Sequence, residues 1–282
     1  MQGTLYIVAT PIGNMEDMTI RAIGVLKKAG IVAAEDTRHT RKLLAHFGIN
    51  TPLESYHEHN EKEKSAYLVE RLKGGVDVAL VSDAGTPGIS DPGYRLIRLA
   101  AESSVPVVSV PGPSAIVAAI SISGLPISEF TFKGFLPHGA GARKKFILEL
   151  KDSPGTYVMY ESPRRLRATL ESVLENIGDV PVVVAREMTK LHEEVMRGSA
   201  REVLERVKDR ELKGEITLIV RVEKDGREAG RAVDPRERIK ELLRGGMRLK
   251  EAVMAVALET GRPRGELYKE ALRVKAESEG SN

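Results

Sequence analysis

Three stretches of this chain follow one plan: a run of apolar, mostly β-branched residues, then a loop of Gly and Pro, then a helical pattern. The runs cover residues 5–9, 76–81 and 105–110, and the loops begin at residues 10, 82 and 111. A fourth run, residues 30–34, ends in Glu35 and Asp36. Apolar strands that alternate with helices predict a mostly parallel sheet buried on both faces. Such sheets bind ligands beyond the carboxyl ends of their strands, so these four segments are expected to meet at one crevice.

The second half of the chain has a different pattern. Strands are predicted at residues 156–160, 180–186, 192–198 and 215–222, and helices at residues 166–177 and 200–210. Residues 125–141 are loop-rich and predict a linker, as do residues 226–230. Three helical segments with a helix-turn-helix-like layout follow. We therefore expect an α/β protein with domains at residues 1–122 and 123–225 and a helical extension at residues 231–282.

Composition excludes several classes of protein. The 282 residues include no cysteine, which rules out disulfides, thiolate catalysis and cysteine-ligated zinc. No stretch approaches the roughly 20 apolar residues that span a bilayer, and the first residues do not resemble a signal peptide, so a cytoplasmic protein without a membrane partner is expected. The net charge of +3 lies in residues 227–282, which hold 13 basic and 10 acidic side chains. That excess fits either an anionic partner or a solvated helical surface.

The individual loops are ambiguous. Residues 10–14 contain one glycine, which matches neither a dinucleotide fingerprint nor a P-loop. His57 and His59 form an H-x-H pair that either binds a metal or lies on the surface. Glu35, Asp36 and Arg38 either begin a capped helix or belong to a polar site. Spacing alone leaves these alternatives open.

Five longer motifs are more specific: residues 34–40 (AEDTRHT), 81–93 (VSDAGTPGISDPG), 134–137 (GFLP), 160–165 (YESPRR) and 185–190 (AREMTK). They resemble those of ribosomal RNA small subunit methyltransferase I, a family of the tetrapyrrole (corrin/porphyrin) methylase superfamily. The resemblance runs from residue 5 to about residue 222, and the tail resembles the helical extension of longer members. It implies two α/β domains of tetrapyrrole-methylase type with the methyl donor in the cleft between them. It also implies a homodimer that transfers a methyl group from S-adenosylmethionine to a ribose 2′-hydroxyl of a cytidine in the decoding region of 16S rRNA.

The resemblance also suggests which residues bind the methyl donor. They belong to the three Gly/Pro loops and are Pro11, Asp83, Gly85, Thr86, Pro87, Ile89, Ser90, Ser114 and Ala115. Thr86 stands where many tetrapyrrole enzymes carry Asp, which favours the RNA-modifying branch. The sulfonium methyl is already an activated electrophile, so we expect no metal requirement.

The acceptor side needs a base and cations. A ribose hydroxyl is a poor nucleophile until it loses its proton. The candidate bases are Glu35, Asp36, His57 and Glu161, with Glu35 or Asp36 as our hypothesis. The cations expected to meet phosphates of 16S rRNA or of the 30S subunit are Arg38, Arg164, Arg165 and Lys190.

RNA recognition by stacking uses exposed aromatic side chains, and this chain has only 12 aromatic residues. Those on the loop side are Tyr56, Tyr94 and Phe135, so we expect shape and phosphate contacts to dominate. Two alternatives remain: a methylase of a tetrapyrrole intermediate with the same fold, and a non-catalytic RNA-binding protein for which the basic tail would suffice.

Overall fold

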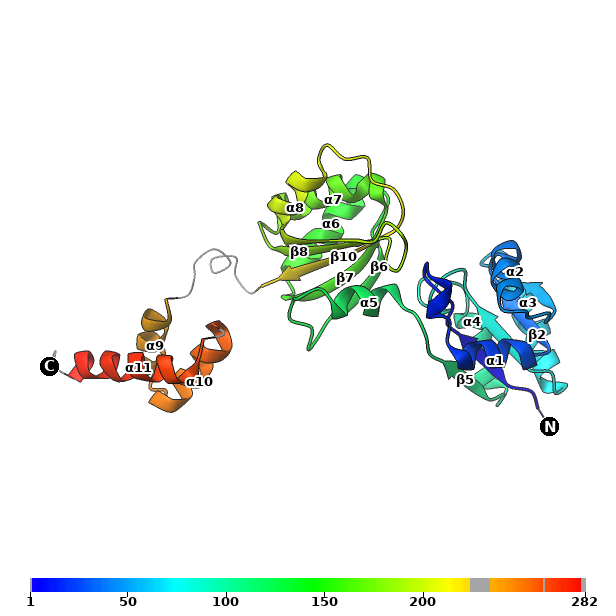
Figure 1. Ribbon diagram of the computed structural model, residues 1–282, viewed down its shortest axis with the longest axis horizontal. Coiled ribbons are helices and arrows are strands. Elements are labelled where there is room, and N and C mark those ends of the chain that lie inside the picture. Colours follow the sequence, from blue (N-terminus) through cyan, green and yellow to red (C-terminus); the bar gives the residue numbers. More distant parts are fainter. Residues whose placement is uncertain (1, 224–233, 261, 280–282) are drawn as a thin grey trace. The chain divides into compact units, whose positions relative to one another are not determined.

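The computed structural model describes residues 2–223, 234–260 and 262–279 (Figure 1). The linker predicted at residues 226–230 lies outside them. The chain divides into two units, one that ends at Val222 and one that begins at Glu223.

The first sheet is entirely parallel, as its apolar runs predict. Its strand order is β3-β2-β4-β1-β5, with β1 (Leu5–Val8), β2 (Ile31–Ala34), β3 (Leu53–Ser55), β4 (Val78–Val81) and β5 (Val107–Val110). The helices between them are α1 (Ile20–Lys28), α2 (Thr37–His46), α3 (Glu61–Lys73) and α4 (Tyr94–Glu102), with a short 3-10 turn, η1 (Met15–Asp17), before α1. All carboxyl ends of the strands therefore face the same edge of the sheet.

Both faces of the first sheet are buried, which explains why its strands are apolar throughout. Helices α3 and α4 cover one face, where Leu68 and Leu96 pack with Leu5 and Leu80. Helices α1 and α2 cover the other, where Leu26 and Leu44 pack with strand residues such as Val32. We call this sheet and its four helices the first lobe.

The second sheet is mixed. Its order is β6-β7-β10-β8-β9, with β6 (Thr131–Phe135), β7 (Gly155–Glu161), β8 (Pro181–Arg186), β9 (Glu194–Ser199) and β10 (Ile216–Val222). Only the β6–β7 pair is parallel; β10 runs antiparallel to β7 and β8, and β9 antiparallel to β8. These two sheets confirm the expected α/β fold class.

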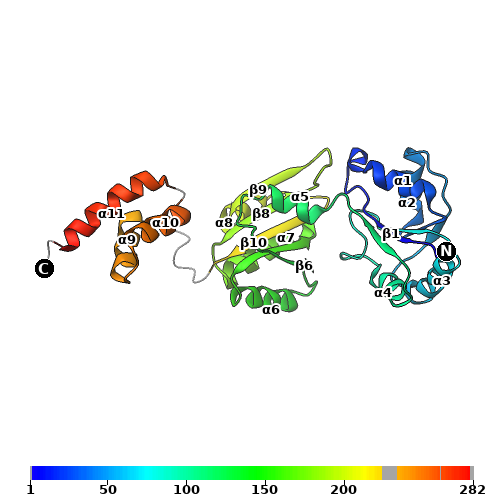
Figure 2. The same cartoon turned by 90° about the horizontal axis from the view of Figure 1, so that it is seen from below.

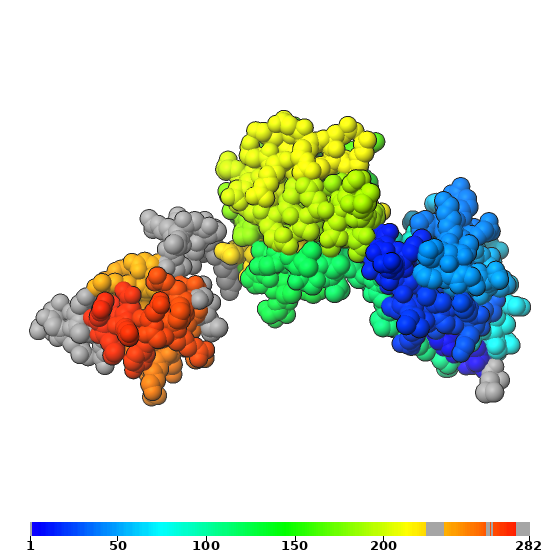
Figure 3. Space-filling view, in the orientation of Figure 1, coloured from blue at the N-terminus to red at the C-terminus, as the bar shows by residue number. Residues whose placement is uncertain are grey.

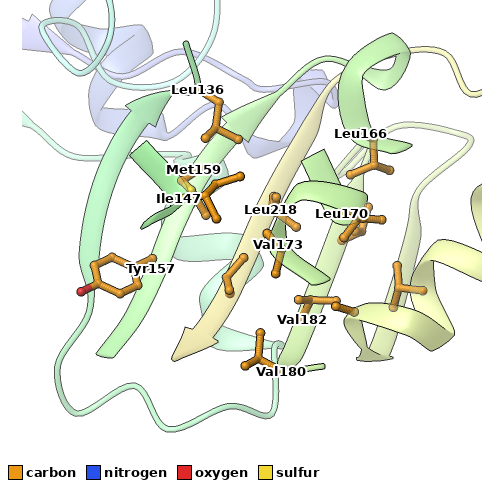
Figure 4. Packing of buried hydrophobic residues seen from close by; sticks show 14 of the residues in the cluster. Leu136, Ile147, Tyr157, Met159, Leu166, Leu170, Val173, Val180, Val182 and Leu218 are labelled. Atoms are coloured by element: carbon orange, nitrogen blue, oxygen red, sulfur yellow. The ribbon is translucent and has the colours of Figure 1, made fainter. Parts of the chain in front are cut away.

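Three helices cover one face of the second sheet: α6 (Ala140–Lys151), α7 (Pro163–Asn176) and α8 (Ala200–Val207). Figure 4 shows Leu166, Leu170 and Val173 of α7 directed toward the strands that carry Met159 and Leu218. The apolar spacing along α7, at residues 166, 170 and 173, produces this buried face.

Helix α5 (Ala115–Ser121) covers the opposite face of the second sheet (Figures 1 and 2). Its buried residues Ile116 and Ile120 pack against Val158 and Val183. A division after residue 122 would assign α5 to the first sheet, which its packing does not support. We propose instead that the first lobe ends in the loop at residues 111–114, and we call the second sheet with α5–α8 the second lobe.

The stretch at residues 125–141 is not a plain linker, contrary to the expectation from its composition. Residues 131–135 form strand β6 and residue 140 begins α6. The strand is short, alternates exposed and half-buried residues, and contains a glycine, so its own pattern gives a weak strand signal. Its pairing with β7 supplies the hydrogen bonds that make it a strand.

The second unit contains the three predicted helices: α9 (Pro235–Arg244), α10 (Leu249–Thr260) and α11 (Arg264–Glu279). They pack around a small apolar core that includes Ile239, Val253, Val256 and Leu267, and they are orange to red in Figure 3. Among the described residues, none of the helices is both long enough and apolar enough to cross a membrane.

Candidate active site

A cavity of about 850 Å³ lies at the carboxyl edge of the first sheet. Its lining includes Ile12 after β1, Glu35 after β2, the loop of residues 83–91 after β4, and Ser114 after β5. The four sequence segments expected to meet at one crevice thus contribute to the same cavity. The second lobe supplies the remaining walls. This volume falls within the range of small-molecule sites, roughly 300–1,000 Å³.

The loops after β1 and β4 are tied together by backbone hydrogen bonds. Thr10 N–H donates to the Gly85 carbonyl at 2.8 Å, and Gly85 N–H donates to the Thr10 carbonyl at 3.0 Å. The buried Thr10 hydroxyl also donates to the Ser82 carbonyl at 3.0 Å. Gly85 has φ of 81°, a conformation that a side chain would strain. The glycine therefore lets the backbone form one wall of the cavity without a side chain.

The second lobe contributes a row of three neighbouring side chains. Thr217 of β10 lies opposite Tyr160 of β7 and Ala185 of β8 in the sheet register, and all three line the cavity. Burial raises the pKa of the Tyr160 hydroxyl to about 12, helped by the charges of Asp91 and Glu215. Tyr160 is therefore a hydrogen-bond donor, not an anion, at neutral pH.

Two carboxyl groups of the cavity have raised pKa values. Burial is the main cause at Glu35, and the nearby charges of Asp91 and Asp83 add to it. Burial is the main cause that raises the pKa of Asp91 to about 6. A hydrogen bond with Ser82 lowers this pKa, and the charge of Asp83 raises it. Asp83 Oδ1 accepts a hydrogen bond from Asp36 N–H at 3.0 Å, which fixes the segment after β2 beside the loop after β4.

Asp36 is the N-cap of α2. Its Oδ1 accepts from Arg38 N–H at 2.8 Å, and its Oδ2 lies 2.9 Å from the Arg38 guanidinium. The hydrogen bonds from the Arg38 side chain and backbone hold the Asp36 pKa far below its usual range. The carboxylate is thus a weak proton acceptor, and it does not belong to the cavity lining.

Glu161 is fully buried and has several hydrogen-bond partners. Its Oε1 lies 2.7 Å from both Ser162 N–H and the Arg165 guanidinium, and its Oε2 accepts from the Thr169 hydroxyl at 2.7 Å. Arg165 also contacts Ser162 Oγ, the Leu136 carbonyl and the His138 ring. The Glu161–Arg165 ion pair therefore stabilises the cavity wall. Both side chains line the cavity, but each already has partners within the protein.

Arg164 differs from its neighbour. It lies in the first turn of α7, is exposed, and lines the cavity. Among the described residues it has no ion-pair or hydrogen-bond partner. It is therefore the cation of the Arg164–Arg165 pair that remains able to bind an anion.

Lys190 lies in a strained loop that touches the first lobe. Burial lowers its pKa, but the hydrogen bonds to Glu187 and Glu215, each 2.9 Å, outweigh burial and raise it overall. The Thr189 hydroxyl accepts from Asn14 N–H at 3.1 Å. Glu187 and Thr189 have positive φ values of 52° and 66°, as does Ser90 across the cavity at 65°. Such outliers cost about 1–3 kcal/mol each and gather at functional sites.

Most residues chosen from the sequence line the cavity, but some do not. The lining contains Glu35, Asp83, Gly85, Thr86, Ile89, Ser90, Ser114, Ala115, Glu161, Arg164 and Arg165. It does not contain Pro11, Asp36, Arg38, His57, Pro87 or Lys190. His57 follows the edge strand β3, where its ring contacts that of His59 at 5.9 Å. Within the described residues no group of three or more His, Cys, Asp or Glu side chains is arranged to hold a metal ion.

Sequence reasoning missed several cavity residues: Ile12, Asp91, His138, Tyr160, Met188 and Glu215. Asp91 belongs to the specific motif of residues 81–93, so its place in that motif was an available signal. Of the three aromatics suggested for stacking, Phe135 lines the cavity, Tyr94 is exposed but outside the lining, and Tyr56 is buried in the first-lobe core.

Comparison with known proteins defines the class. Residues 4–204 match the model of the Tetrapyrrole (Corrin/Porphyrin) Methylases. The structure resembles cobalt precorrin-4 methyltransferase, with a TM-score of 0.58 and 18% identity over 77% of this chain and 94% of that one. It also resembles diphthine synthase, with a TM-score of 0.61 and 17% identity over 78% of this chain and 90% of that one. The fold is that of a methyltransferase of tetrapyrrole-methylase type.

Closer relatives narrow this class. Ribosomal RNA small subunit methyltransferase I of Halalkalibacterium halodurans is 44% identical over 95% of this chain and 94% of its own length. The protein of the same name from Synechocystis is 40% identical over 98% and 99%. The chain therefore belongs to the ribosomal RNA small subunit methyltransferase I family.

Members of this methylase family use S-adenosylmethionine as their methyl donor. The donor carries a positively charged sulfonium, and the cavity holds the acidic groups of Glu35, Asp83 and Asp91. It also offers apolar walls at Ile12 and Met188 for a flat base. The residues present therefore fit the donor in charge and in apolar surface.

Proposed function

We propose that this protein transfers the methyl group of S-adenosylmethionine to the ribose 2′-hydroxyl of a cytidine in the decoding region of 16S rRNA. The observation that carries the proposal is 44% identity, over nearly the whole of both chains, to a protein named for methylation of small-subunit rRNA. The acidic cavity beside the exposed Arg164 supports it, because the cavity suits the donor and the guanidinium suits RNA phosphate. When bound, the donor supplies a methyl group already activated by the sulfonium.

The donor site that we propose consists of the lining residues of the three Gly/Pro loops: Asp83, Gly85, Thr86, Ile89, Ser90, Ser114 and Ala115. Pro11 and Pro87 belong to the same loops, where they shape the backbone rather than line the cavity. Holding the acceptor oxygen in line with the methyl group and sulfur supplies much of the rate enhancement of such a transfer.

The proton acceptor that we propose is a carboxylate of the cavity. Of the four candidates from the sequence, Glu35 is in the cavity with a raised pKa, whereas Asp36 and Glu161 are held by cationic partners. Asp91 is a second acceptor that the structure adds. Loss of turnover in Glu35→Gln but not Asp91→Asn would select Glu35, and the opposite result would select Asp91. If Glu35→Ala combined with Asp36→Ala leaves turnover intact, the hypothesis based on that pair is wrong.

For the RNA we propose phosphate contacts from Arg38, Arg164 and the basic C-terminal unit. Lys190 and Arg165 are a weaker choice, because they are partly buried beside the carboxylates that neutralise them, whereas Arg38, although paired with Asp36, keeps 85% of its side chain exposed. We expect RNA binding to weaken steeply as the salt concentration rises, since each phosphate contact releases a counterion and so steepens the dependence of the binding constant on salt. A flat response of the dissociation constant to salt contradicts this.

We further propose a cytoplasmic homodimer. Exposed apolar side chains at α5 and just after it, Val117 and Ile122, support a second protein surface there. Light scattering of the full chain distinguishes a dimer from a monomer.

Methyl transfer from labelled S-adenosylmethionine to 30S subunits and to naked 16S rRNA tests the main proposal, with the product nucleoside identified by mass spectrometry. We expect 2′-O-methylcytidine. Label on neither RNA, with donor binding intact by calorimetry, favours a tetrapyrrole acceptor instead. The tetrapyrrole enzymes among the similar structures share about 20% identity with this chain, so they support the fold alone.

A further inference from the structure

One aromatic side chain stands exposed at the cavity. Phe135, the last residue of β6, lines the cavity and is 61% exposed. Its ring centroid lies 5.1 Å from that of Tyr160, which in turn lies 5.1 Å from the half-buried Phe132. The outer ring is thus supported from within by two others, while much of its own surface faces solvent. An aromatic surface of this kind is where unpaired bases stack.

A bulge in β6 places Phe135 on this side of the sheet. Phe132 lies opposite Val158 of β7, and Phe135 lies opposite Tyr160, so three steps along β6 match two along β7. Gly134 provides the extra residue with φ of 69°. Without the bulge, the alternation of the strand would direct Phe135 to the opposite face, where Lys133 lies over the Tyr157 ring. Bulges next to active sites commonly redirect one side chain in this way.

The same cavity contains an anion-binding group. Arg164 lines it, is exposed and has no partner among the described residues, because its neighbour Arg165 forms the ion pair with Glu161. An aromatic ring and a cation at one cavity match the two parts of a nucleotide, the base and the phosphate. A cavity of about 850 Å³ has the size of a small-molecule site, so it suits a single nucleotide rather than a double helix.

Resting on the proposed rRNA methylation, we propose that Phe135 is the stacking surface for the base of the acceptor nucleotide, with Arg164 at an adjacent phosphate. The enzyme then acts on a nucleotide that has left its base stack. The ribose between base and phosphate lies toward the first-lobe carboxylates. The low aromatic content of the sequence predicts that shape and phosphate contacts dominate RNA recognition. Stacking on Phe135 would add a direct contact to one base.

The test compares Phe135→Ala, Phe135→Leu and Phe135→Tyr in methyl transfer to 30S subunits. We expect kcat/KM to fall about 5- to 150-fold in the Ala variant, the range for loss of one base–aromatic stack. The Leu variant keeps apolar bulk without a flat ring and should lose nearly as much, while the Tyr variant should stay within about threefold of the wild type. Donor affinity, measured by calorimetry without RNA, should be unchanged in all three.

Phe130 provides a matched control, because it is an exposed phenylalanine just before the same strand and outside the cavity lining. Phe130→Ala should keep the wild-type kcat/KM. Equal activity of Phe135→Ala and wild type, or full activity of Phe135→Leu, overturns the stacking assignment while the methylation stands. Absence of transfer to any RNA by the wild-type protein overturns the proposed function itself, and the two failures are therefore distinguishable.

Discussion

Replacement of Asp91 by Asn tests the electrostatics of the cavity directly. Burial raises the pKa of this carboxyl group to about 6, with a further contribution from Asp83. In an unfolded chain the same group has a pKa of about 3.9. The folded protein therefore holds the proton more tightly than the unfolded one. The stabilising effect of protonation is fully present below about pH 4 and is lost as the pH rises through 6.

The magnitude follows from the size of the shift. A difference of about two pKa units corresponds to about 3 kcal/mol, at 1.36 kcal/mol per unit. Because the Asp91 side chain is only half-buried, solvent screens its charge, so we expect the charged form to destabilise the fold by about 1 to 3 kcal/mol. Asparagine is nearly isosteric and carries no charge. Asp91→Asn should therefore raise the free energy of unfolding by about 1 to 3 kcal/mol at pH 8, and by about a third of that at pH 4.5.

Urea titrations of the donor-free protein at both pH values measure this difference. Asp152→Asn is the control, because Asp152 is exposed at the end of α6 and replacement of an exposed side chain should change the free energy of unfolding by less than about 0.5 kcal/mol. An Asp91→Asn effect that is equal at the two pH values, or a destabilisation at pH 8, would refute the reasoning. A stabilised variant that also loses activity would show that the cavity keeps an unfavourable charge for its function.

Three other substitutions have distinct expected outcomes. Asp36→Ala removes the cap of α2 and should lower the urea midpoint of unfolding without lowering kcat, since Asp36 is outside the cavity lining; a large fall in kcat contradicts this. Arg165→Ala leaves the Glu161 charge buried and should lower the free energy of unfolding by about 3–5 kcal/mol. Arg164→Ala should change the free energy of unfolding by no more than about 0.5 kcal/mol and should weaken RNA binding instead. Equal losses of unfolding free energy in the two variants would refute this distinction. Gly13→Ala places a Cβ against Lys190 Cγ, closer than van der Waals contact allows, and should lower the free energy of thermal unfolding by about 1–3 kcal/mol; no loss would mean that the loop at residues 187–190 moves without cost.

The first lobe was largely predictable, because its strands depend on properties that the sequence carries locally. Apolar runs such as residues 78–81 have to be buried on both faces, and only a sheet covered by helices does this. The carboxyl ends of parallel strands meet at one edge whatever the details of packing. The approximate place of the cavity therefore followed from the order of strands and Gly/Pro loops alone.

The second lobe was less predictable, because its outer elements depend on distant partners. Helix α5 has an apolar face that would suit either sheet, and only the contacts of Ile116 and Ile120 show which one it covers. Strand β6 needs the neighbouring β7 and a bulge at Gly134 to form at all. Neither the partner of a helix nor the register of a bulge is encoded in local periodicity.

Roles within the cavity depend on burial and partners, which residue type does not reveal. Arg164 and Arg165 are identical and adjacent, yet helical geometry gives them different environments. Arg165 comes within 2.7 Å of the buried carboxylate of Glu161 at the end of β7, while Arg164 is rotated by about 100° around α7 and is exposed. One arginine therefore holds the wall of the site and the other is available to substrate. The carboxylates divide in a similar way: Asp36 and Glu161 have cationic partners and support structure, whereas Glu35 and Asp91, which have no ion-pair partner among the described residues, have the raised pKa values that suit proton transfer.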